Sequence, residues 1–152
     1  MIAFWDVLHA IFAMLLLGAV THQGLSVWRK PAPARAVIDR FRAVNGPGYA
    51  NAVVVLYLVT FALGCYIYPP YVLDVKSSLF AAGLSGQVGL FQIKEHVAVV
   101  ALALLPVYWH YWRTVPLTED TGIRRFVTTV IMVAVWWNLV VGHILNNTKG
   151  LV

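Results

Sequence analysis

Apolar residues dominate four stretches of the chain, and polar residues gather between them. The stretches cover about residues 4–28, 49–68, 94–112 and 124–146. Each approaches the roughly 20 residues that an α-helix needs to cross a hydrocarbon core of about 30 Å. The pattern therefore predicts an all-α integral membrane protein, with residues 1–152 forming a single domain folded as a four-helix up-down-up-down bundle.

Composition and charge agree with a membrane protein whose main partner is the lipid bilayer. The chain is 61% hydrophobic and 11% charged, far from the balance of a soluble domain. Its net charge of +5 lies mostly in the connections and does not indicate nucleic-acid binding. The basic residues of the first and third connections are Arg29, Lys30, Arg35, Arg40 and Arg42, then Arg113, Arg124 and Arg125. The positive-inside rule places these connections in the cytoplasm. We therefore expect both termini outside, on the periplasmic side of a bacterial inner membrane.

The third apolar stretch carries a histidine near each end. His96 and His110 are fourteen residues apart, which is nearly four whole helical turns and about 21 Å of rise. They share one face of the helix near opposite membrane surfaces, with the small Ala103 midway between them. In this the stretch resembles the helices with which transmembrane b-type cytochromes hold one haem near each surface.

Three further histidines fall on the first and fourth stretches. His9 and His22 are thirteen residues apart on the first, about 20 Å along a helix, and His143 lies near the end of the fourth. Ionisable residues within a membrane are costly and mark candidate functional sites. By depth, His9, His96 and His143 form an outer layer, and His22 and His110 form an inner layer.

The first and third helices of such a bundle are parallel and can lie diagonally across the core, which leaves room for a macrocycle between two imidazoles. This geometry predicts an outer haem held by His9 and His96 and an inner haem held by His22 and His110. Thirteen residues leave His9 and His22 about 140° apart around their helix. Both therefore reach the same partner only if the helix kinks, for example near Gly18. The sequence is compatible with one haem b group or with two.

On these residues the chain resembles the transmembrane four-helix b-type cytochromes, the group that includes cytochrome b561 and related quinone-linked membrane subunits. The resemblance rests on His96 and His110 at their spacing, on His9 and His22, and on four helices that cover most of the chain. It implies electron transfer between a quinol pool and a redox centre on a partner protein or in a larger membrane complex. The chain would be an electron-transfer subunit or a membrane-bound oxidoreductase.

Two alternatives stand beside the haem hypothesis. In that hypothesis, His143 and Glu95 border the outer site and exchange protons with a quinone. In the first alternative, His9, His96 and His143 bind one non-haem metal, such as copper, zinc or non-haem iron, since imidazole suits all three. In the second, the chain is a structural accessory subunit whose histidines make hydrogen bonds between helices.

The second connection is the longest segment expected outside. Pro69 and Pro70 are predicted to end the second helix. Residues 71–92 mix apolar residues with glycines and are too polar to span the membrane. We expect them to lie along the outer interface or to fold over the mouth of the bundle.

Overall fold

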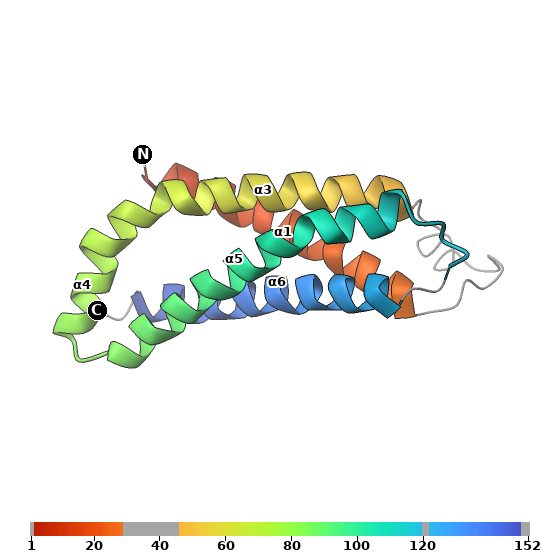
Figure 1. Ribbon diagram of the computed structural model, residues 1–152. Helices are drawn as coiled ribbons and strands as arrows, with labels where there is room; N and C mark the ends of the chain where they lie inside the picture. Colours follow the sequence, from red (N-terminus) through yellow and green to blue (C-terminus); the bar gives the residue numbers. More distant parts are fainter. Residues whose placement is uncertain (1, 29–45, 120–121, 150–152) are drawn as a thin grey trace, which may run out of the picture.

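A computed structural model describes residues 2–28, 46–119 and 122–149 of the chain. The four long helices of this described part are α1 Ile2–Trp28, α3 Gly46–Pro70, α5 Ser85–Arg113 and α6 Gly122–Lys149 (Figure 1). Each is long and apolar enough to cross a membrane. The predicted all-α, four-helix membrane architecture is confirmed. Most of the first connection, residues 29–45, lies outside the described residues.

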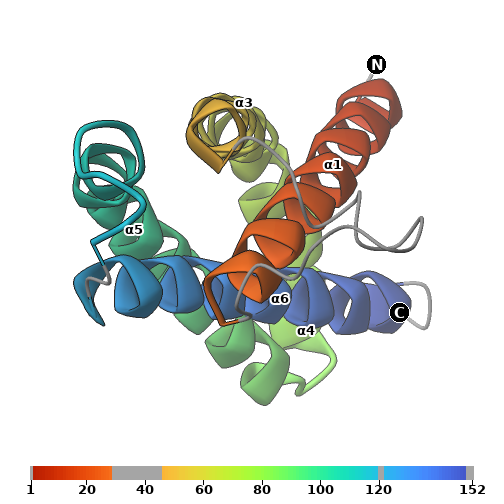
Figure 2. The ribbon, with the colours of Figure 1, turned by 90° about the vertical axis from the view of Figure 1, so that its right-hand side faces the viewer.

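The helices pack as a ring. α1 packs against α3 and α6, and α5 packs against the same two helices. Figure 2 shows α1 and α5 on opposite sides of α3, so they are the diagonal pair that the topology predicts. α1 begins and α6 ends at the same end of the bundle (Figure 1). We call this the terminal end, and the other the loop end.

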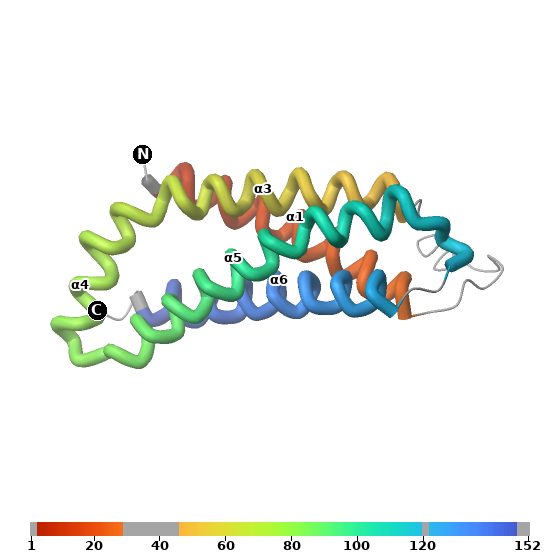
Figure 3. The backbone as a smooth tube through the Cα atoms, in the orientation of Figure 1, coloured from red at the N-terminus to blue at the C-terminus, as the bar shows by residue number. Residues whose placement is uncertain are grey.

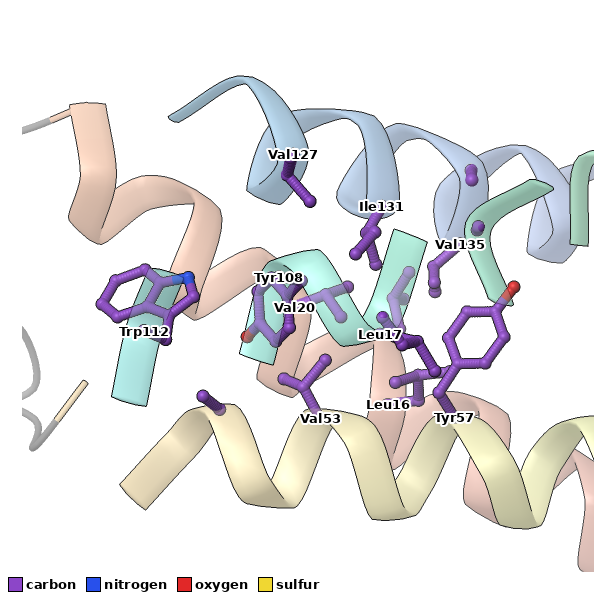
Figure 4. Close-up of a cluster of buried hydrophobic side chains, with 14 residues drawn as sticks. Leu16, Leu17, Val20, Val53, Tyr57, Tyr108, Trp112, Val127, Ile131 and Val135 are labelled. Carbon is purple, nitrogen blue, oxygen red and sulfur yellow. The ribbon is translucent and has the colours of Figure 1, made fainter. Parts of the chain in front are cut away.

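Buried apolar side chains from all four helices meet in the middle of the bundle and toward the loop end. Figure 4 shows Leu16, Leu17, Val20, Val53, Tyr57, Tyr108, Trp112, Val127, Ile131 and Val135. Two of the hydrogen bonds that join different helices involve side chains of this core. The Trp112 indole donates to the Thr128 hydroxyl over 2.9 Å, and the Tyr57 hydroxyl donates to the Ala98 carbonyl over 2.7 Å. Such bonds matter because a buried polar atom without a partner is costly in an apolar environment.

The prediction that Pro69 and Pro70 end the second helix holds for its α-helical part, which ends at Pro70, but the chain stays helical beyond it. α3 runs through both prolines and continues as a π-helical turn, η1 Tyr71–Lys76, and a short helix, α4 Ser77–Ala81. Proline lacks a backbone N–H, and its ring clashes with the carbonyl four residues earlier. The wider π-helical spacing accommodates this defect, and the chain bends here without leaving the helical state (Figure 3).

The second connection is mostly helical. η1 and α4 arch from α3 to α5 at the terminal end (Figure 3), and the side chains of Val75, Leu79 and Val88 are buried together there. Gly83 makes the turn into α5 with a φ of +74°, a conformation that glycine adopts without steric cost. α5 then begins at Ser85, well before the predicted start at residue 94.

Candidate functional site

The face that α5 turns toward the bundle determines which side chains can form an internal site. Ala101, Leu105, Tyr108 and Trp112 are buried along this face. Lys94 lies on the same stripe, because it precedes Ala101 by seven residues, or nearly two turns. His96 precedes Leu105 by nine residues, which places it about 180° around the helix.

The stripe that carries the two histidines of α5 points away from the bundle. His96, Ala103 and His110 are all exposed. On α1, by contrast, His9 precedes the buried Val20 by eleven residues, about three turns, and so lies on the inner face. The body of α5 therefore lies between the rings of His9 and His96, and the structure does not bring this predicted pair together.

His9 is held by α3. Its Nδ1 lies 3.0 Å from the carbonyl oxygen of Thr60. Because a carbonyl oxygen only accepts hydrogen bonds, Nδ1 carries the hydrogen, and Nε2 keeps a lone pair in the neutral ring. Gly64 of α3 lies against the ring, since a Cβ at this position would be 3.4 Å from His9 Cε1. His9 is thus fixed in orientation, with Nε2 available to another group.

Lys94 and His9 lie within electrostatic range of each other. The charged side chains that act on the His9 ring are Lys94 and Asp6. The stem of Lys94 passes α6 at Gly142, where a Cβ would be 3.7 Å from Lys94 Cε. Its ammonium lies 5.2 Å from the centroid of the Phe91 ring, a distance at which a cation interacts with an aromatic face.

Glu95 lies between these two environments. Its charged neighbours are Lys94, Lys76 and His96. Successive residues of a helix are about 100° apart, so Lys94, Glu95 and His96 point to different sides of α5. Glu95 is therefore placed to interact electrostatically with both the inner lysine and the outer histidine.

The remaining histidines make separate local contacts. The His22 ring lies 5.1 Å from the Tyr49 ring of α3, measured between centroids. His110 Nδ1 lies 2.9 Å from the Thr114 hydroxyl on its own helix. His143 is exposed, with Nε2 3.1 Å from the Asn147 amide nitrogen. None of these contacts joins two of the histidines that the sequence assigned to one site.

These placements do not bring His9 and His96 together as the two ligands of one haem. His9 points into the bundle and His96 points out of it. For the three-histidine alternative, the part of the chain that the structure describes contains no group of three or more His, Cys, Asp or Glu side chains placed to hold a metal ion.

One histidine does border a groove. A groove of about 800 Å³ runs between α5 and α6, with almost entirely apolar walls. The buried Ala101 and Ala134 line it, together with larger exposed side chains such as Phe126 and Trp137. Its α6 side extends over residues 122–137, about 22 Å along a helix. The groove therefore covers much of the thickness of a membrane.

His96 lines this groove toward the terminal end. Its Nδ1 lies 2.7 Å from the carbonyl oxygen of Gln92, one turn earlier on α5. The carbonyl again requires Nδ1 to carry the hydrogen, so Nε2 of the neutral ring is a hydrogen-bond acceptor. The groove thus combines long apolar walls with an acceptor near one end.

Trp28 and Arg125 line the groove toward the loop end. The Trp28 indole donates to the Thr129 hydroxyl over 2.9 Å, and the guanidinium carbon of Arg125 lies 6.0 Å from the centroid of the Trp28 ring. These contacts join α1 to α6 at this end. Sequence reasoning missed the groove because its walls depend on the relative placement of three helices.

Comparison of the chain with protein-family models, curated proteins and solved structures found no match. The arrangement of its own residues therefore carries the functional argument.

Proposed function

We propose that the protein is a quinone-linked membrane subunit that binds an isoprenoid quinone or quinol in the groove between α5 and α6. The observation that carries the proposal is the acceptor His96 Nε2 near one end of a long apolar groove. An isoprenoid tail needs apolar walls, and a quinol ring needs a partner for its hydroxyl group. Binding sites of this kind are typically apolar, with a few polar groups that fix orientation.

The proposed chemistry begins with a hydrogen bond from a quinol hydroxyl to His96 Nε2. Oxidation of the quinol releases two protons and two electrons. His96 accepts one proton as a general base, while its Nδ1–H remains bonded to the Gln92 carbonyl. The neighbouring Glu95 carboxylate acts electrostatically on His96 and accepts the second proton. The electrons pass to a redox centre on a partner protein or in a larger membrane complex.

The charge of the connections supports an orientation for this reaction. Under the positive-inside rule the basic first and third connections, at the loop end, face the cytoplasm. The terminal end, with His96 and Glu95, would then face the periplasm, and quinol oxidation would release protons on that side. A haem held by two histidines of the chain is not part of this proposal, because the body of α5 lies between His9 and His96.

Quinone binding can be measured through the tryptophans that line the groove. A decyl-substituted benzoquinone is titrated into the purified protein in nanodiscs made without quinone, and quenching of tryptophan fluorescence is recorded. We expect saturable quenching in the wild type and an apparent Kd about tenfold higher in His96→Ala, as for the loss of one hydrogen bond to the ligand. His110→Ala is the matched control, since His110 shares the helix face but does not line the groove.

Saturable quenching with wild-type affinity in His96→Ala, or no saturable quenching in the wild type, would contradict the proposal. An equal loss in both variants would instead favour a site that uses the whole histidine stripe of α5.

A further inference from the structure

The groove between α5 and α6 has a second polar side chain in its wall, the indole of Trp137. Trp137 belongs to α6 and His96 to α5, and both side chains line the groove. An indole N–H only donates hydrogen bonds, whereas Nε2 of the neutral His96 ring accepts them. The groove therefore offers a ligand one donor and one acceptor, from the two helices that form its walls.

Two contacts between α5 and α6 give the level of Trp137 along the groove. Lys94 lies against Gly142, and the Trp112 indole donates to the Thr128 hydroxyl. The two helices run in opposite directions (Figure 1). Counted from these contacts, Trp137 lies three to seven residues beyond the histidine, or about 5–10 Å along the groove. One aromatic ring with polar groups on both sides spans such a separation.

The Trp137 indole is left without a protein partner. Four other indoles donate to a side chain of a neighbouring helix, namely Trp28 to Thr129, Trp109 to Asn51, Trp112 to Thr128 and Trp136 to Thr21. Within the described residues, Trp137 Nε1 makes no such bond. Trp137 lies near the middle of α6, a depth at which neither water nor an acyl chain provides an acceptor. Because an unpaired N–H is costly there, a ligand oxygen is the partner that this donor lacks.

We propose that the Trp137 indole donates a hydrogen bond to one oxygen of the quinol ring, while His96 Nε2 accepts a hydrogen bond from the hydroxyl group on the opposite side. This proposal rests on the quinone site proposed above and names the head group that it recognises. The two contacts together select a ring with two oxygens in para positions over a lipid with a single hydroxyl group. After oxidation, the carbonyl oxygen accepts a hydrogen bond from the same indole.

The test compares two ligands that differ by one hydroxyl group. Decylhydroquinone and 2-decylphenol, which lacks the hydroxyl para to the first, are titrated without oxygen into the full-length protein in quinone-free nanodiscs. Binding is measured by isothermal titration calorimetry, and empty nanodiscs give the background from partition into lipid. We expect the wild type to bind decylhydroquinone about tenfold more tightly than 2-decylphenol, as for one additional hydrogen bond.

Variants locate the additional bond. Trp137→Phe should weaken the binding of decylhydroquinone about tenfold and leave that of 2-decylphenol unchanged, so that the two affinities become equal. A loss of ring packing alone would weaken both ligands alike. Trp136→Phe is the matched control, because the Trp136 indole is bonded to Thr21 and does not line the groove. This control should keep the wild-type preference for decylhydroquinone.

A second measurement needs only the wild type. In ¹⁵N–¹H spectra of protein labelled at the tryptophan indole nitrogens, a new hydrogen bond moves the indole N–H signal downfield. We expect one indole signal to move in this way with decylhydroquinone and to move less with 2-decylphenol. The signal that is missing from Trp137→Phe should be the one that moves.

The outcomes separate this proposal from the quinone site on which it rests. The assignment of Trp137 is overturned if the wild type binds both ligands equally, if Trp137→Phe keeps the preference or weakens both ligands alike, or if no indole signal moves. Those results leave the groove as a quinone site. Absence of saturable decylhydroquinone binding in the wild type, or unchanged affinity in His96→Ala, would instead contradict the quinone site itself.

Discussion

His96 Nδ1 lies 2.7 Å from the carbonyl oxygen of Gln92, one turn earlier on the same helix. This bond selects the ring tautomer with hydrogen on Nδ1 and a lone pair on Nε2. We predict that the neutral His96 ring is found in this tautomer in ¹⁵N NMR spectra of histidine-labelled protein, with assignment by loss of the signal in His96→Ala. A neutral ring protonated on Nε2 would remove the acceptor from the groove.

Arg124 is predicted to stabilise the loop end more than any other charged side chain of the third connection. It is 6% exposed, and its guanidinium donates to the carbonyl oxygens of Tyr111, Val115, Pro116 and Glu119. These bonds satisfy carbonyls at and beyond the end of α5 that have no helical partner. Arg124→Met should lower the free energy of unfolding by about 3 kcal/mol.

Denaturation in a mixed-detergent titration measures this loss, and Arg113→Met serves as control because Arg113 is exposed. The control should change stability by less than about 0.5 kcal/mol. Equal effects of the two substitutions would show that the Arg124 bonds to the loop carbonyls do not stabilise the fold.

Two glycines of the bundle should respond oppositely to alanine. A Cβ at Gly46 would lie 2.5 Å from Cζ3 of the Trp112 ring, and the indole is buried and bonded to Thr128. Gly46→Ala should therefore destabilise the protein by about 1–3 kcal/mol through overpacking. At Gly18 no atom lies within 4 Å of the added Cβ, so Gly18→Ala should be neutral or stabilising by up to about 1 kcal/mol.

The same unfolding titration compares the two variants. A stable Gly46→Ala protein would mean that the Trp112 ring moves easily, and a strongly destabilised Gly18→Ala protein would mean that Gly18 meets another molecule in the membrane.

Tyr57→Phe tests the hydrogen bond that joins α3 to α5 near the middle of the bundle. The Tyr57 hydroxyl donates to the Ala98 carbonyl over 2.7 Å in a buried position. Interhelical hydrogen bonds in membrane proteins contribute about 0.6 kcal/mol on average and up to about 2. We expect Tyr57→Phe to lower the free energy of unfolding by about 1 kcal/mol. Quenching of tryptophan fluorescence by quinone should not change, because Tyr57 does not line the groove. A loss of quinone binding in this variant would show that the groove depends on the hydrogen bond between Tyr57 and Ala98.

The number and approximate position of the membrane helices could be predicted from the sequence, because a helix that spans a membrane requires about 20 apolar residues. The helical continuation beyond Pro70 could not be predicted, because proline stops most helices and the π-helical turn that follows it has no simple apolar pattern. The early start of α5 was missed because Ser85, Gly86 and Gln87 resemble a loop.

The orientation of α5 about its axis was the main limit on predicting the site. In a soluble helix, apolar periodicity marks the buried face, but lipid is as apolar as the protein interior. Val99 and Val100 are exposed, whereas Ala101 and Leu105 are buried, and all four are apolar. The better signal was Lys94, because a charged residue within a span usually faces the interior of the bundle.

Photolabelling tests the central claim most directly. Wild-type protein, His96→Ala and His110→Ala in nanodiscs are irradiated with an isoprenoid azidoquinone, and the labelled residues are mapped by mass spectrometry. We predict that the labelled residues are those of α5 and α6 that line the groove, from His96 at one end to Phe126 at the other. A natural quinone should compete this labelling away, and the labelling should fall sharply in His96→Ala but not in His110→Ala. Competed labelling confined to other surfaces, or labelling of the groove that does not change in His96→Ala, would contradict the account.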